Sequence, residues 1–119
     1  MADGNALDGV VVLDLTRVLA GPLCAQMLGD MGADVIKVEH PGRGDDTRHW
    51  GPPFADTEAA YFLGVNRNKK SLALDFKSPA GLQVLKKLVQ KSDIVIDNFK
   101  PGLLDKLGLT SDWFKTEAE

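Results

Sequence analysis

The sequence has little cysteine and no long apolar run. Its single cysteine, Cys24, has no partner for an internal disulfide, so a reducing, cytoplasmic setting fits. No apolar stretch approaches the roughly 20 residues needed to cross a membrane. Residues 1–5 contain no basic region followed by an apolar stretch, and they are poor in arginine. We therefore expect neither a secretory signal nor a mitochondrial transit peptide in residues 1–119, and a mitochondrial location stays open if the natural N-terminus lies upstream.

A basic excess is also missing, as is any set of residues with metal-ligand or triad spacing. Lys and Arg total 14 against 17 Asp and Glu, a net charge of −3, which argues against nucleic-acid binding. His40 and His49 have no Cys or Glu at ligand spacing, so we predict two exposed loop histidines and no metal site. No Ser/His/acid or Cys/His set can be argued from spacing.

What is present first is a strand–helix–strand pattern. The β-branched run Val10–Leu15 predicts a buried strand, and Val35–Glu39 predicts a second one. Between them, Pro22 suits a first helical turn and Gly32 suits a helix end. Four apolar residues at helical spacing predict the buried face of this helix, with Cys24 packed beside it: Leu23, Met27, Leu28 and Met31. Such a unit implies a right-handed parallel crossover.

The alternation continues to the end of the sequence. Residues 41–53 have loop composition, residues 67–70 suggest a solvated basic turn, and residues 72–76 alternate like a strand. Ser78 and Pro79 predict the start of a helix whose buried stripe is Leu82, Leu85, Leu88 and Val89. A strand at 93–97, a short helix within 101–108 and a helix start at 110 follow. We predict an α/β fold with an open, mostly parallel, Rossmann-like sheet and flanking helices.

A dinucleotide site is the first candidate function for this pattern. It requires G-x-G-x-x-G at the first strand–helix turn, but residues 16–22 contain one glycine followed by Pro22. Glu39 ends the second strand where a ribose-binding acid would lie, which is weak support without the glycines. We therefore do not expect NAD or FAD binding. Asp45 and Asp46 are interpreted as loop-shaping ion-pair residues, with Arg43 and Arg48 nearby.

An ordered set of segments carries a family resemblance. The segments are Leu7–Gly9, Leu13–Thr16, Val18–Pro22, Leu28–Glu39, Pro41–Gly42, Gly44–Arg48, Asn66–Ser71, Leu74–Asp75, Asn98–Phe99 and Pro101–Gly102. Together they resemble the N-terminus of family III CoA-transferases, a group that includes formyl-CoA transferase, carnitine CoA-transferase and α-methylacyl-CoA racemase. The stretches 44–53 and 66–71 are most similar to the succinate–glutarate type.

The resemblance implies a set of CoA-binding residues. Leu19 and Ala20 would lie along the pantetheine arm, as would Asn98 and Phe99. The adenosine end would be contacted by Leu74, Phe76 and Lys77, with Lys77 as the phosphate candidate. His40 and Lys106 stand where the family often has arginines, so each departs from the pattern: histidine is shorter and mostly neutral at pH 7, and lysine lacks the bidentate fork. Simpler interpretations stay open, because Lys77 and Lys106 suit a solvated surface and Leu74 and Phe76 suit the core.

The resemblance also implies a mechanism whose nucleophile is absent from residues 1–119. In the family, an aspartate attacks the acyl-CoA thioester and then carries CoA while carboxylic acids exchange. No aspartate of this sequence matches that motif, so we expect the catalytic aspartate beyond Glu119. Residues 1–119 are then expected to be an N-terminal CoA-binding segment, cut short at its C-terminus and inactive alone. The expected ligands are an acyl-CoA and a small carboxylic acid, with no tightly bound cofactor, and the expected assembly is an interlocked homodimer. A racemase and a non-catalytic binding module remain alternatives.

Overall fold

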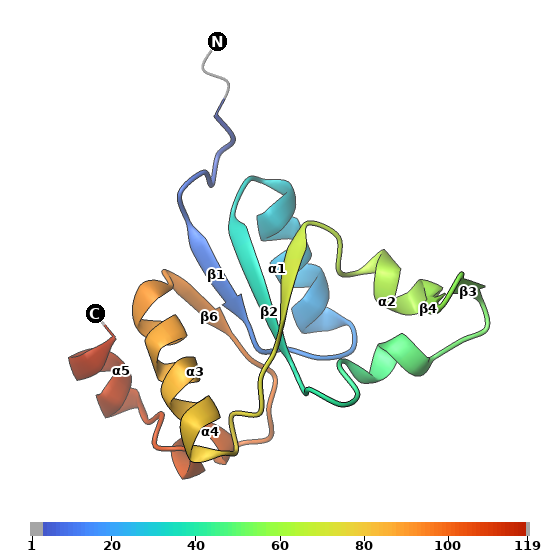
Figure 1. Cartoon of the computed structure of the whole chain (residues 1–119). Coiled ribbons are helices and arrows are strands. Elements are labelled where there is room, and N and C mark those ends of the chain that lie inside the picture. The colour runs from blue at the N-terminus through green and yellow to red at the C-terminus, as the bar shows by residue number, and fades with distance from the viewer. Residues whose placement is uncertain (1–3, 119) are drawn as a thin grey trace.

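A four-stranded parallel sheet forms the centre of the computed structural model, which describes residues 4–118 (Figure 1). Its strands lie in the order β5-β2-β1-β6, with β1 at Val11–Asp14, β2 at Asp34–Glu39, β5 at Lys69–Ala73 and β6 at Ile94–Ile96. All three pairings are parallel. The predicted fold class and the strands expected near 10–15, 35–39 and 93–97 are confirmed.

The start of β5 corrects the sequence prediction. This strand begins at Lys69, inside the segment that we expected to be a solvated turn, and Lys69 pairs in register with Val35 of β2. The Lys69 side chain is only 2% exposed and has acceptors inside the protein. A lysine can be buried in this strand because the charge of its ammonium group has partners inside the protein.

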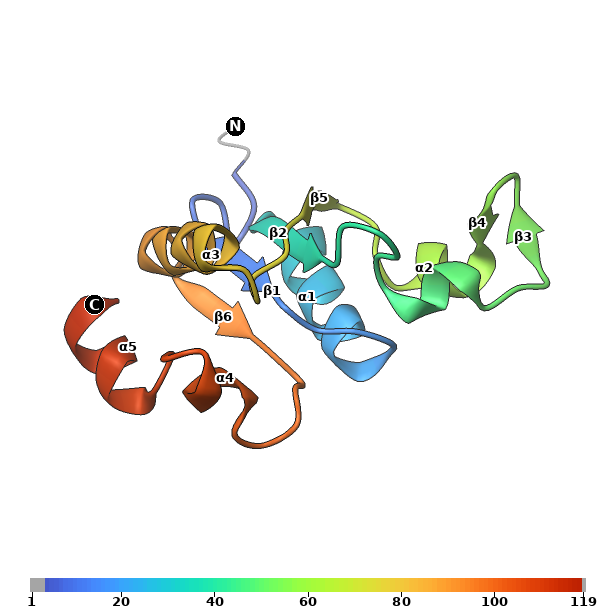
Figure 2. The same cartoon turned by 60° about the horizontal axis from the view of Figure 1, so that its bottom comes forward.

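Helices pack on both faces of the sheet (Figure 2). On one face, Val12 and Val35 pack against Ala25 of α1 (Ala20–Asp30). On the other, Leu13 packs with Leu85 of α3 (Pro79–Lys91). Adjacent strand residues point to opposite faces, so Val12 and Leu13 serve different cores. Two further helices, α4 (Leu103–Lys106) and α5 (Ser111–Glu117), add apolar side chains to the α3 side.

Helix α3 matches its predicted start and buried stripe. Ser78 accepts a hydrogen bond from the Gly81 backbone and caps the helix, with Pro79 at its first position. Leu85 and Val89 are buried, and Leu82 and Leu88 pack against the same core. Thr110 likewise caps α5 by accepting from the Trp113 backbone, so that predicted helix start is also confirmed.

The described part of the C-terminus ends just after helix α5. Helix α5 ends at Glu117, and Ala118 is the last described residue. Glu119, beyond which we expect the catalytic aspartate, lies outside the described residues. The position of that aspartate therefore stays a prediction.

The predicted buried face of α1 is wrong except at Leu28, which packs against the core. Leu23, Met27 and Met31 are 41, 57 and 44% exposed, and Cys24 is exposed as well. The helix instead buries Pro22, Ala25 and Gln26. Small Ala25 lets the helix approach the sheet, and the Gln26 side chain accepts from the Arg67 backbone and donates to the Gly64 carbonyl.

The segment between β2 and β5 extends away from the sheet (Figure 1). The loop predicted at 41–53 contains a short 3-10 helix, η1 (Asp46–His49). After it come a hairpin of β3 (Phe54–Ala55) and β4 (Glu58–Ala59), and then α2 (Ala60–Gly64). The Trp50 and Tyr61 rings meet edge to face with centroids 5.4 Å apart. Among residues 4–118, no helix is both long and apolar enough to span a membrane.

Candidate functional site

Two pockets open beside the loop that joins β1 to α1, at the carboxyl edge of the sheet. That edge is where ligands bind in open α/β folds. The pocket with the longer lining is called the larger pocket, and the other is called the smaller pocket. The lining of the larger pocket comes from all four strand ends and α4: Leu15, Thr16, Arg17, Lys37, Val38, Glu39, His40, Gly44, Asp45, Leu74, Asp75, Phe76, Lys77, Phe99 and Leu103. The smaller pocket is lined by Arg17, Val18, Leu19, Ala20, Asp46 and Asn98.

The structure sorts the predicted binding residues between these pockets. The larger pocket holds His40, Leu74, Phe76, Lys77 and Phe99, and the smaller one holds Leu19, Ala20 and Asn98. Phe99, which the resemblance places beside the arm, lines the larger pocket. Lys106 lines neither pocket and is exposed on α4. Their roles in binding CoA stay predictions.

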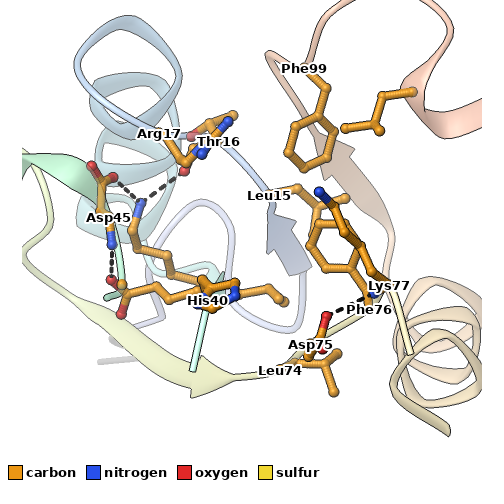
Figure 3. A pocket seen from close by; sticks show the side chains of 15 residues that line it. Leu15, Thr16, Arg17, His40, Asp45, Leu74, Asp75, Phe76, Lys77 and Phe99 are labelled. Atoms are coloured by element: carbon orange, nitrogen blue, oxygen red, sulfur yellow. Dashed lines mark hydrogen bonds and ion pairs between the residues drawn. The ribbon is translucent and has the colours of Figure 1, made fainter. Parts of the chain in front are cut away.

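The larger pocket has one mainly apolar side. Phe76 and Phe99 pack at a tilt with ring centroids 5.8 Å apart, and Leu15 lies with them (Figure 3). Leu74, Phe76 and Phe99 also pack against the buried core below. The core interpretation and the pocket interpretation therefore both apply to Leu74 and Phe76. An apolar, aromatic wall of this kind suits a heterocyclic ring.

The opposite side is polar and contains a buried ion pair (Figure 3). Lys37 lies 2.9 Å from Asp45, with side chains 2 and 0% exposed, and it also donates to the Thr16 carbonyl at 3.0 Å. Burial alone would raise the pKa of Asp45, but hydrogen bonds from Thr47 and the ion pair with Lys37 hold it below its ordinary value. We expected Asp45 to pair with a neighbouring arginine, and that was wrong.

Glu39, which also lines this pocket, forms a second ion pair with Arg48. The Arg48 guanidinium donates to both Glu39 oxygens, at 2.7 and 2.8 Å, and Ser71 and the Asp45 backbone also donate to Glu39. Burial would raise the pKa of Glu39, yet these hydrogen bonds and the Arg48 charge lower it from 4.5 to about 2. Both carboxylate oxygens of Glu39 thus accept hydrogen bonds from groups inside the protein, so they are not available to the hydroxyl groups of a ribose.

Lys69 closes the base of the β1–α1 turn. It lies 2.8 Å from Asp14 of β1 and donates to the Pro22 carbonyl of α1 at 2.9 Å. Burial lowers the pKa of Lys69, and the Asp14 carboxylate acts in the opposite direction. The ammonium ties the end of the strand to the start of the helix.

Asn98 holds the backbone of Arg17 in place through its side chain, a role that the sequence did not predict. Its side-chain oxygen accepts from the Arg17 N–H at 3.1 Å, and its amide group donates to the Arg17 carbonyl at 2.8 Å. Sequence reasoning also missed Arg17 and Lys37. Lys37 had a usable signal, because an isolated lysine inside an apolar strand requires a buried partner.

His40 and His49 are both exposed, as predicted, although His49 is the last residue of η1 and not part of a loop. Within residues 4–118, no group of three or more His, Cys, Asp or Glu side chains is arranged to hold a metal ion.

Family membership follows from comparison with known proteins. The model of CoA-transferase family III matches residues 7–117, nearly the whole sequence. The chain belongs to CoA-transferase family III. This confirms the resemblance inferred from the ordered motifs.

Named CoA-transferases are similar to this chain over most of its length. Succinyl-CoA:glutarate CoA-transferase of Mus musculus is 58% identical over 103 residues, covering 87% of this chain and 24% of the mouse protein. Succinate–glutarate CoA-transferase of Agrobacterium fabrum is 52% identical, covering 87% and 27%. A crystal structure of a CAIB/BAIF family protein from Brucella suis superimposes with a TM-score of 0.87 at 49% identity, covering 94% and 30%. The chain thus spans about a quarter of the length of these curated relatives.

Proposed function

We propose that this chain supplies the CoA-binding part of a CoA-transferase that moves CoA between an acyl-CoA and a carboxylic acid. The observation that carries the proposal is the division of the site. One pocket has an aromatic wall with Lys77 among its lining residues, and the adjacent pocket is lined by Leu19, Ala20 and Asn98. CoA has the matching parts: a charged adenosine end and a long, largely neutral arm.

The chemistry we propose is acyl transfer through an aspartate beyond Glu119. Its carboxylate attacks the thioester carbonyl and expels CoA thiolate, which gives a mixed anhydride. The thiolate then attacks the aspartyl carbonyl and releases the first acid, leaving an aspartyl-CoA thioester. The incoming carboxylate reverses these steps and leaves as the new acyl-CoA. Covalent catalysis of this kind divides one difficult displacement into easier ones.

The proposed acids are dicarboxylates such as succinate and glutarate. The names of the mouse and Agrobacterium relatives, at 58 and 52% identity, support this class over the racemase alternative. We further propose that residues 1–119 form the N-terminal segment of a larger domain in a cytoplasmic homodimer. The exposed apolar side chains of Leu23, Met27 and Met31 support a covering partner on α1.

Binding calorimetry with CoA and with NAD tests the proposal. We expect CoA to bind and NAD to bind more weakly or not at all, because the β1–α1 turn lacks the glycine fingerprint and Glu39 is engaged by Arg48. Tighter binding of NAD than of CoA would refute a CoA site.

A further inference from the structure

The loop Thr16–Val18, between β1 and α1, is held by side chains at four successive backbone groups. Lys37 donates to the Thr16 carbonyl at 3.0 Å. Asn98 engages both the N–H and the carbonyl of Arg17, at 3.1 and 2.8 Å. The Val18 N–H then points at the Asp45 carboxylate, 3.3 and 3.4 Å from its two oxygens.

These contacts hold a conformation that the loop residues do not favour by themselves. Val18 has φ of 78°, in the left-handed region that a β-branched residue rarely adopts. Such backbone conformations persist where surrounding contacts over-determine them, and they cluster at binding sites. Lys37 and Asp45 are fully buried, so these two of the three side chains that fix the loop are themselves rigidly placed.

Arg17 lies at the centre of this fixed loop. It is exposed and is shared by the linings of both pockets. Among the described residues, Arg48 pairs with Glu39 and Arg67 pairs with Asp30, whereas no carboxylate of residues 4–118 lies within ion-pair distance of Arg17. A guanidinium with no carboxylate partner among residues 4–118, at the junction of two pockets, is available to an anionic ligand.

We propose that Arg17 binds the pyrophosphate of CoA and that Asn98 acts as its positioning residue; this rests on the proposed function. The pyrophosphate joins the adenosine part of CoA to the pantetheine arm. If the larger pocket takes adenosine and the smaller one takes the arm, the pyrophosphate crosses the junction at Arg17. The guanidinium fork matches phosphate oxygens in geometry as well as charge. Asn98 fixes both backbone groups of Arg17 and so fixes where that fork begins.

Titrations of the 119-residue chain with three ligands, followed by NMR, test this assignment. The ligands are CoA, 3′-dephospho-CoA and pantetheine. Arg17→Gln is expected to weaken CoA and 3′-dephospho-CoA by the same factor, about ten-fold or more, and to leave pantetheine unchanged. Lys77→Gln is the matched control, because loss of a 3′-phosphate contact would weaken CoA alone. An amide spectrum like that of the wild type verifies the fold of each variant.

A double-variant cycle separates positioning from simple support of the fold. If Asn98 acts through Arg17, Asn98→Ala weakens CoA in the wild type and has little further effect in the Arg17→Gln background. Equal losses in both backgrounds would overturn the positioning role. Unchanged CoA affinity in Arg17→Gln, or equal weakening of all three ligands, would overturn the assignment of Arg17. Failure of the folded wild type to bind CoA would instead refute the proposed function.

Discussion

Replacing Glu39 with glutamine removes the charge at the centre of the β2 carboxyl end. Both Glu39 oxygens accept from the Arg48 guanidinium, and Ser71 and the Asp45 backbone donate to them as well. Glu39 is 7% exposed, so solvent cannot replace these partners. In the Glu39→Gln variant, the Arg48 charge remains partly buried and loses its main partner, which is the costly case for an ion pair.

The pKa of Glu39 sets the size of the effect and its pH dependence. Folding lowers this pKa from 4.5 to about 2, which corresponds to about 3 kcal/mol of stability at neutral pH. Because the folded-state pKa is the lower one, the contribution is complete above pH 4.5 and is lost as the pH falls toward 2. We expect Glu39→Gln to cost about 2–3 kcal/mol at pH 7, since the amide keeps some hydrogen bonds.

Urea unfolding of both proteins at several pH values between 7 and 2.5 measures this difference. The stability gap should be constant above pH 5 and should narrow below it. Glu58→Gln is a matched control, because Glu58 meets the same Arg48 at 3.2 Å but its side chain is 41% exposed, so about 0–1 kcal/mol is expected. A gap that stays constant down to pH 2.5, or an equally large loss in Glu58→Gln, would refute the reasoning.

Three other predictions concern the pocket, the helix α3 and activity. Lys77→Ala should weaken CoA binding by about 1–3 kcal/mol, measured by calorimetry, whereas Lys70→Ala should have no effect; equal affinities would return Lys77 to the surface interpretation. Gly81→Ala should destabilise the fold by about 1–3 kcal/mol despite the helix propensity of alanine, because the added Cβ would lie 1.8 Å from the Asp75 carbonyl oxygen. Gly64→Ala in α2 meets nothing within 4 Å and should be neutral or stabilising. The 119-residue chain should exchange no CoA between succinyl-CoA and glutarate; turnover that survives purification would place the nucleophile inside it.

The parts of the fold that the sequence predicted are those with one dominant local signal. The apolar β-branched run of β1 has no other stable interpretation, and Ser78 followed by Pro79 specifies the start of α3 through capping chemistry. In both cases the local preference and the tertiary environment agree. The alternation of strands and helices predicted the fold class, and the family resemblance added most of the predicted positions that line the pockets.

The α1 prediction failed because hydrophobicity does not report how close a helix lies to a sheet. Leu23, Met27 and Met31 form a clear apolar stripe at helical spacing, yet they face outward. Close packing selected the small Ala25, and a buried amide at Gln26 satisfies the backbone of the next crossover. Burying a glutamine is unfavourable unless its side chain has hydrogen-bond partners. The sequence did not reveal those partners, because they lie about 40 residues along the chain.

The polar side of the site shows why residues considered one at a time predict it poorly. Lys37 lies inside an apolar strand and so requires a buried partner, but the sequence does not say which one. Asp45 and Asn98 have an ordinary surface interpretation, and nothing in the spacing relates the three residues. They meet because β1 lies between β2 and β6, so the loop leaving β1 is flanked by the ends of both neighbouring strands. Side chains from either side can then bind successive backbone groups of that loop and hold Val18 at positive φ. The same position makes this loop the lining shared by both pockets, so the central place of β1 in the sheet determines both how the loop is fixed and which ligand groups it can reach.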